Sequence, residues 1–172
     1  LDLKRHGFAL AAADLKSTAL SPTGDHLVVG ARGQCQLSGP DQQNWSALLE
    51  RLTRYAAVLR PFKEMAPPRL AQSADNRLWK LASTALSIRR MGQQDLRELL
   101  RLLLINIADV LNDELEDDRL KGLIAFDTTL GSHLGPRSPN SLLRLLNRLA
   151  GETLSLPAGG MGSVAAAMAK AV

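Results

Sequence analysis

Apolar residues recur at helical spacing over most of this chain, and at strand-like spacing only near its start. A spacing of three and four residues places side chains on one stripe of an α-helix. Between residues 40 and 60 this stripe consists of Trp45, Leu48, Leu49, Leu52, Tyr55, Ala56 and Leu59. The pattern predicts a first long helix over 40–60, capped by Ser38 or Gly39 and ended by Pro61.

The same spacing continues after a linker that carries Pro67-Pro68. We expect a second helix from Asp75 or Asn76 to Arg90, stopped by Gly92. A third is expected from about 93 to 111, apolar on more than half of its surface, which is typical of a helix buried on several sides or packed against a partner. Shorter helices are expected over 120–130, over 141–149 and at the end of the chain, and the acidic run 113–118 is interpreted as a solvated helix end or loop.

Residues 1 to 38 carry a different pattern, with short apolar segments between turn residues. HLVVGA is β-branched and apolar, and QCQLS, around Cys35, alternates polar with apolar residues. Turns are expected at Pro22–Asp25 and at Arg32-Gly33. Because two strands alone are marginal in water, a hairpin or meander here needs another element to cover it. The predicted fold class is α+β, mostly helical, with a small antiparallel sheet near the N-terminus.

Composition and charge exclude several classes of protein. The single cysteine, Cys35, cannot form an internal disulfide, which favours a reducing, cytoplasmic compartment. The three histidines are far apart and no C-x-x-C pair exists, so no metal site is expected. The net charge of +4 is spread through helices that also carry acids, which argues against nucleic-acid binding. The longest apolar run, Leu102–Ile105, is far too short to span a membrane.

A distinctive order of segments runs from Met91 to the C-terminus. The stretch DLRELLRLLLINIADVLNDELEDDRLKGLIAFDTTLGSHLGPRSPNSLLRLLNRLAG reads as a helix, an acidic segment, a Gly-Pro loop and a further helix, and LPAGGMG follows at 156–162. DLKRHGF and LSPTGDHLVV stand near the start. Together these segments resemble the middle, substrate-side region of the phytoene-dehydrogenase-like family of FAD-dependent oxidoreductases. The resemblance is good over 91–172 and weaker before.

This resemblance implies a part of a flavoprotein. Members of the family bind FAD through an N-terminal βαβ unit and transfer hydride from apolar or amine-type substrates to the flavin. Their middle region builds the lid and walls of the substrate cavity. Residues 1–172 would then be a substrate-domain fragment, with strands and loops over 1–38 and helices over 39–172. Its partner would be the missing flavin-binding domain, which holds FAD in the full-length parent, and no FAD is expected on this chain alone.

The candidate site residues follow from the same resemblance. Gly159, Gly160, Met161 and Gly162 are expected to face substrate or flavin, although a tight turn before a helix would need glycine anyway. Residues 160–165 also match G-x-G-x-x-A, but Pro157 stands where a buried strand should lie, so we interpret the match as a decoy. His133 is a candidate polar group of the cavity, against the simpler interpretation of a loop histidine. Cys35 is expected to be a buried, inert thiol, and the sequence identifies no catalytic residue.

A second class of function stays open, that of a helical interaction module without catalysis. The broad apolar surface of 96–111 supports it, because a helix that is apolar on several sides needs a partner. An excised domain would expose the same kind of surface where its missing half once packed. Both interpretations predict a homo-oligomer, formed by dimerisation or domain swapping of the isolated chain.

Overall fold

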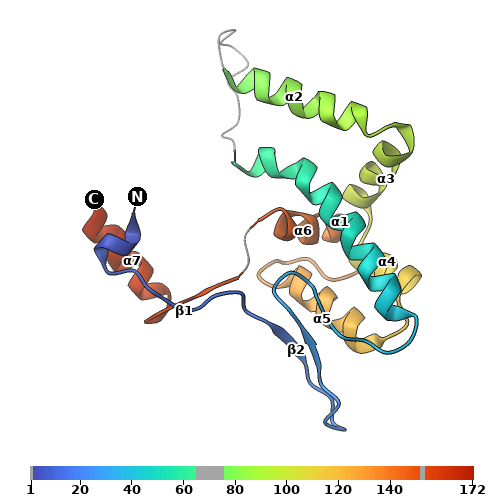
Figure 1. The fold of residues 1–172 in the computed structure, drawn as a ribbon, viewed down its shortest axis with the longest axis horizontal. Helices are drawn as coiled ribbons and strands as arrows, with labels where there is room; N and C mark the ends of the chain where they lie inside the picture. Colours follow the sequence, from blue (N-terminus) through green and yellow to red (C-terminus); the bar gives the residue numbers. More distant parts are fainter. Residues whose placement is uncertain (1, 65–75, 152–153) are drawn as a thin grey trace. The chain divides into compact units, whose positions relative to one another are not determined.

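The chain folds into two compact units, each built around its own elements. The computed structural model describes residues 2–64, 76–151 and 154–172. Unit 1 comprises Leu1–Gln36 and Thr153–Val172, and unit 2 comprises Leu37–Glu152. The chain therefore passes twice between the units. The described elements of unit 2 are all helices, while those of unit 1 are two small antiparallel sheets, a short 3-10 helix and the last helix (Figure 1). The predicted α+β, mostly helical class is confirmed.

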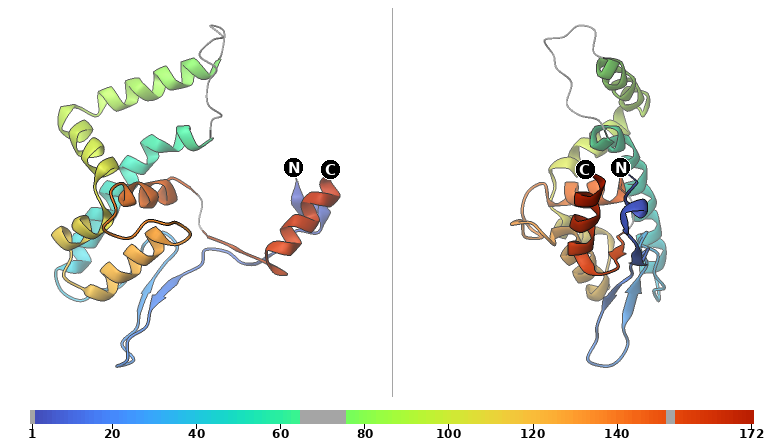
Figure 2. Two further views of the ribbon diagram at one scale, coloured as in Figure 1. Left: turned by 180° about the vertical axis from the view of Figure 1, so that it is seen from behind. Right: turned by 90° about the vertical axis from the view of Figure 1, so that its left-hand side faces the viewer.

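Unit 2 is a set of helices packed around one of them. Its elements are α1 (Asp41–Glu64), α2 (Asn76–Arg90), α3 (Gln93–Leu104), α4 (Ile107–Glu114), α5 (Asp118–Thr129) and α6 (Ser141–Leu149). The short α6 packs against α1, α3 and α5 (Figure 2). Leu142 and Leu146 of α6 are fully buried at these contacts. The core of unit 2 therefore lies around α6, and the other helices cover it on several sides.

The first helix buries the stripe that its sequence predicts. Trp45, Leu48 and Leu52 are at most 2% exposed. Its predicted end at Pro61 is wrong, because α1 continues to Glu64 with Pro61 inside it. Proline lacks the N–H that would bond to the carbonyl of Ala57. Ala57 lies on the exposed side of the helix, where water can satisfy that carbonyl, so the last turn survives. The predicted linker at Pro67-Pro68 lies outside the described residues.

The predicted third helix is two helices, which corrects the single helix expected over 93–111. The break lies at Ile105 and Asn106, whose backbones are extended. The Asn106 side chain accepts a hydrogen bond from the N–H of Asp109 at 2.8 Å, so it caps α4. The first N–H of α4, at Ile107, donates to the buried hydroxyl of Ser141 at 2.9 Å. The apolar pattern continues across the break because each helix buries apolar side chains of its own: Leu99 and Leu102 in α3, and Ile107, Val110 and Leu111 in α4.

The acidic segment after α4 is held by hydrogen bonds rather than merely solvated. The buried carboxylate of Asp41 accepts from the backbone N–H of Glu116 at 3.0 and 3.1 Å and from that of Asp117 at 2.6 Å. Asp117 in turn caps α5 and pairs with Arg119 at 2.7 Å. Asp41 thus fixes the backbone between α4 and α5, and Asp117 caps the N-terminus of α5.

The stability contributed by Asp117 is expected to depend on pH. Its hydrogen bonds with the Arg119 side chain lower the pKa of the Asp117 carboxyl, and the backbone N–H groups of α5 act in the same direction. A lowered pKa stabilises the fold above about pH 4, the unfolded value, and this contribution is lost as pH falls through the folded pKa. In urea unfolding between pH 3 and 7, the free energy of unfolding of Asp117→Asn should therefore fall less steeply toward acid pH than that of the parent chain.

A matched variant separates the charge from the cap. Asparagine caps a helix as well as aspartate does, whereas Asp117→Ala removes both functions and should cost about 1 kcal/mol at neutral pH. If the free energy of unfolding of Asp117→Asn fell toward acid pH as steeply as that of the parent chain, Asp117 would not be the source of this pH dependence.

Unit 1 contains the hairpin that the sequence predicts near the N-terminus. Strands β2 (Ser17–Ala19) and β3 (Leu27–Val29) pair antiparallel around the turn at Pro22–Asp25. The second predicted turn is present as well, since the N–H of Gly33 donates to the carbonyl of Gly30 at 2.9 Å. The expected strand at Cys35 is wrong, because residues 34–38 belong to no strand.

A second sheet joins the two ends of the described chain. Strand β1 (Leu10–Ala12) pairs antiparallel with β4 (Leu156–Pro157), and the 3-10 helix η1 (Leu3–His6) packs against α7 (Gly160–Ala171). The two termini consequently lie side by side (Figures 1 and 2). The bonds extend beyond the strands, from the N–H of Leu15 to the carbonyl of Leu154 at 3.0 Å. Sequence patterns did not predict this sheet, because its strands are very short and far apart.

Candidate functional site

The glycine turn before α7 is a real turn with an open surface. Gly159 and Gly160 have φ of +77° and +71°, a left-handed conformation that glycine adopts without strain. The side chain of Met161 is 72% exposed. A Cβ added to Gly162 would meet no atom within 4 Å. The turn therefore has no side-chain cap at the start of α7, and its positive φ angles suit both interpretations of its glycines.

The same turn does not form a dinucleotide-binding loop. Such a loop follows a parallel strand and opens the helix of a βαβ unit. Here the preceding strand is β4, which pairs antiparallel with β1 in a sheet of two strands. The interpretation of residues 160–165 as a decoy agrees with this geometry. The described residues do not fit a complete FAD site, and no chemical step is derived through a flavin held by them.

His133 lies in the loop between α5 and α6. The imidazole is exposed, and the loop residues around it, Gly131–Asn140, form no helix or strand. The loop is nonetheless fixed, since the N–H of Ala108 donates to the carbonyl of Pro136 at 3.1 Å. His133 belongs to unit 2 and the glycine turn to unit 1. The structure thus places the two predicted parts of the site on separate units.

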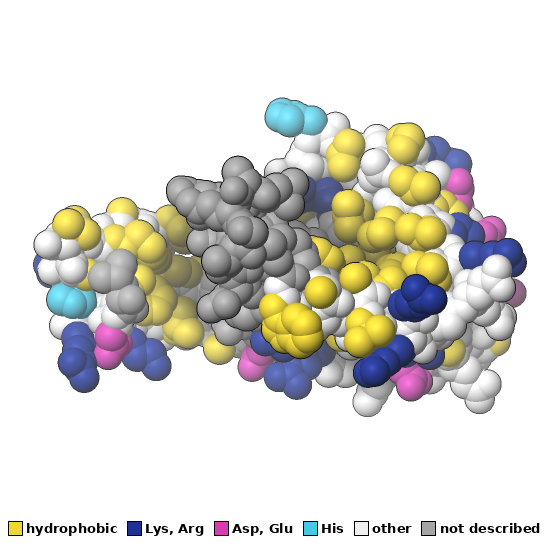
Figure 3. All heavy atoms as spheres, turned by 90° about the horizontal axis from the view of Figure 1, so that it is seen from above, with side chains coloured by type: hydrophobic (Ala, Val, Ile, Leu, Met, Phe, Trp, Pro, Cys, Tyr) yellow, Lys and Arg dark blue, Asp and Glu magenta, His cyan; other side chains and the backbone are white. Residues whose placement is uncertain are grey.

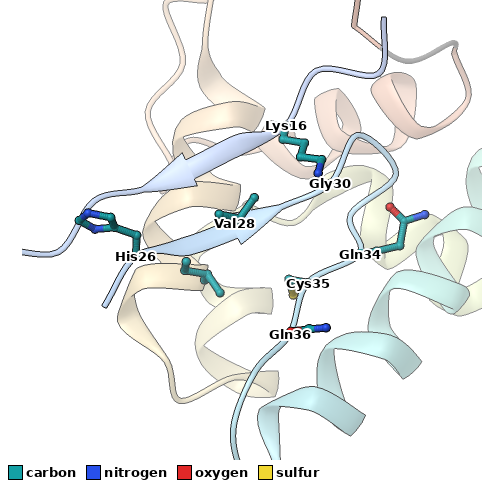
Figure 4. A pocket seen from close by; sticks show the side chains of 8 residues that line it. Lys16, His26, Val28, Gly30, Gln34, Cys35 and Gln36 are labelled. Carbon is teal, nitrogen blue, oxygen red and sulfur yellow. The ribbon is translucent and has the colours of Figure 1, made fainter. Parts of the chain in front are cut away.

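An open depression of about 560 Å³ lies beside the hairpin of unit 1. Figure 4 shows Lys16 pointing toward Gly30, with Cys35 on the segment after the second turn. His26 also lines the depression, but it lies at the opposite end of the hairpin from Lys16 (Figure 4). Cys35 is half-buried, which is less than the sequence led us to expect.

A polar cleft of about 920 Å³ in unit 2 is a feature that sequence analysis missed. Arginines and acids from α1, α3 and α4 line it: Arg51, Arg54, Asp95, Arg97, Glu98, Arg101 and Glu114. Arg54 and Tyr55 meet on one carboxylate, that of Asp95, at 3.1 and 3.0 Å. Arg51 pairs with Glu114, so this bond ties α1 to α4. The only sequence signal for the cleft was the interleaving of arginines with acids.

The chemistry of this cleft is that of an ionic contact between helices. Burial raises the pKa of the Tyr55 phenol, and its hydrogen bond to Asp95 acts in the same direction. Tyr55 therefore stays protonated at neutral pH and acts as a hydrogen-bond donor. Arg101 holds Glu98 through two bonds, at 3.0 and 3.2 Å. Because the acids are paired with arginines, none of them is positioned as a free general base.

The described residues show neither a metal centre nor a membrane-spanning helix. Within the described residues no group of three or more His, Cys, Asp or Glu side chains could hold a metal ion. No helix in that part of the chain is long and apolar enough to cross a membrane. Comparison with protein-family models, with curated proteins and with solved structures gave no match.

Proposed function

We propose that this chain is the substrate-side region of an FAD-dependent oxidoreductase similar to phytoene dehydrogenase. The observation that carries the proposal is the discontinuous make-up of unit 1. Residues before 37 and residues after 152 pair with each other through β1 and β4, while 37–152 form a separate helical unit. This is the arrangement of a domain inserted into another. It suits a helical substrate-side insertion carried by a larger flavin-binding body, as the resemblance over 91–172 implies.

Unit 1 has too little core to stand without a partner, which supports the same proposal. Among its described hydrophobic residues only Leu27, Val29 and Ala167 are buried. Leu10 and Leu156, on the two paired strands, are 46% and 50% exposed. Sheets of two strands are marginal in water unless another element covers them. The flavin-binding domain is the covering element that we propose.

In such an enzyme the flavin accepts hydride from the substrate, and the residues of this chain shape the cavity beside it. Gly159–Gly162 are the residues we propose to face substrate or flavin, because the turn has no side-chain cap at the start of α7 and leaves space above Gly162. His133 stays a proposed polar group of the cavity wall. These roles rest on the resemblance together with the open surface at each position.

The alternative is a helical interaction module without catalysis. Its specific support is on α3, where Leu100 and Leu104 are 52% and 67% exposed although Leu99 and Leu102 are buried. Exposed leucines on a helix that already contributes to a core are typical of a contact surface. The two candidate functions differ in whether a flavin accompanies the chain.

The proposal is tested by expressing the complete reading frame that contains this sequence and recording its absorbance. We expect a yellow protein with stoichiometric FAD, whereas the 172-residue chain alone should be colourless, because its glycine turn follows an antiparallel strand. A complete protein without flavin would contradict the proposed function and favour the interaction module. Stoichiometric FAD on the 172-residue chain would instead contradict the conclusion that the described residues do not fit a complete FAD site.

A matched pair of glycines serves as the control for the site. Gly162 in α7 and Gly122 in α5 are both helical, and an added Cβ meets nothing within 4 Å at either position. In the complete protein, Gly162→Val should lower flavin content or turnover if this turn faces the cavity, while Gly122→Val should not. Equal effects of the two variants would remove the glycine turn from the proposed site.

A further inference from the structure

The outward face of α2 combines exposed apolar side chains with cations. Trp79 is 77% exposed and Leu86 is 47% exposed. Trp79, Leu86 and Arg90 follow one another at spacings of seven and four, so they share one stripe of the helix. Figure 3 looks down on unit 2 from the side of α2, and hydrophobic side chains gather there with Lys and Arg at the border. This stripe, which we name the Trp79 stripe, is open to its surroundings.

The rest of α2 faces its neighbours in unit 2. The helix packs against α1 and α3, and among its described side chains only Thr84 is buried. Between α1 and α2 lies a groove of about 350 Å³, lined by Ala57, Val58 and Pro61 of α1 and by small polar side chains of α2.

The charge of this helix restricts what can cover the Trp79 stripe. The sequence 76–90 contains four Lys or Arg residues and no Asp or Glu. Arg89 and Arg90 are exposed in its last turn. A second copy of the same helix would oppose like charges, which disfavours a symmetric dimer through this face. The complementary surface is therefore anionic, and it must also accept an indole and a leucine.

We propose that α2 binds the surface of an anionic lipid bilayer, lying in the interface plane. Trp79 and Leu86 enter the boundary between headgroups and acyl chains, where tryptophan is enriched in membrane proteins. Arg89 and Arg90 contact the headgroup phosphates, and each contributes to binding in the way of cations near an anionic leaflet. The inference rests on α2 alone and does not depend on the proposed oxidoreductase.

The test uses the full 172-residue chain with phosphatidylcholine vesicles, with and without phosphatidylglycerol. We expect co-sedimentation at least about tenfold stronger with phosphatidylglycerol, falling as salt is added. Tryptophan emission should shift to the blue on binding, and Trp79→Phe should abolish the shift because Trp45 is buried throughout. Arg89→Gln and Arg90→Gln should each weaken binding about fivefold.

The matched control is Phe126→Ser on α5, where the phenyl group is 60% exposed. Trp79→Ser should weaken vesicle binding about tenfold, while Phe126→Ser should leave it unchanged. Equal binding to both vesicle types, or an equal loss in both variants, would overturn the proposal. Binding to polyglutamate as tight as to vesicles, without a shift of the Trp79 emission, would overturn it as well and would indicate an acidic protein partner. None of these outcomes bears on the flavin test.

Discussion

Replacing Leu146 with alanine is expected to destabilise unit 2 by about 3 kcal/mol. Leu146 is fully buried on α6, the helix that packs against α1, α3 and α5. The truncation loses the transfer free energy of three carbon atoms and leaves a cavity that several rigid helices cannot all close.

The measurement is urea unfolding followed by the emission of Trp45, in a Trp79→Phe background so that a single buried indole reports unit 2. Leu143→Ala serves as the control, since Leu143 lies on the same helix but is 38% exposed, and it should cost less than about 1 kcal/mol. The milder Leu146→Val should fall between the two. A cost for Leu146→Ala no larger than that for Leu143→Ala would contradict the central place of α6 in the core.

Replacing Asp41 with alanine is expected to cost about 3 kcal/mol, because two backbone N–H groups would lose a charged acceptor. The carboxylate is 4% exposed and accepts from Glu116 and Asp117. Leu115, next to Glu116, is buried, so the segment that loses this acceptor lies against the core. The connection between α4 and α5 should therefore loosen, and α5 should lose its fixed starting point.

The same unfolding measurement checks this expectation, with Asp41→Asn and Gln43→Ala beside it. Asparagine keeps one acceptor oxygen and should retain about half of the stabilisation. Gln43 is exposed in the first turn of α1 and should tolerate alanine within about 0.5 kcal/mol. Faster amide hydrogen exchange at Glu116 and Asp117 in Asp41→Ala would confirm the local cause, and unchanged exchange would contradict it.

Helical spacing predicted most of unit 2 because each helix buries one stripe. The helix over 141–149 has the bounds that its leucines indicate, and α2 ends at Arg90 before a glycine with φ of +89°. Spacing could not predict the break at Asn106, since the apolar pattern runs through it and the cap depends on a side-chain bond. The predicted helix end at Pro61 was wrong because the hydrogen bond that proline cannot make falls on the solvent side of α1.

Features formed by distant residues were the ones that sequence analysis missed. The pairing of β1 with β4 and the bond from Asp41 to residues 116 and 117 both join segments far apart in the chain. The arginine-lined cleft has the same origin, since Asp95 meets Arg54 and Tyr55 from another helix. Of the candidate site, the sequence predicted the glycine turn and the exposed loop of His133, and it gave no sign that they belong to different units.

The double passage between the units has a consequence for how the protein is made. A chain leaves the ribosome from its N-terminus, so β1 emerges long before its partner β4, and all of unit 2 is synthesised between them. Unit 2 is continuous in sequence and can fold as soon as it has emerged. During that interval the apolar edge of β1 has no strand to pair with, which is the state in which nascent chains aggregate or require a chaperone. Completion of unit 1 therefore waits for the residues that follow unit 2, and premature termination near residue 152 would leave a folded helical unit carrying an unpaired strand.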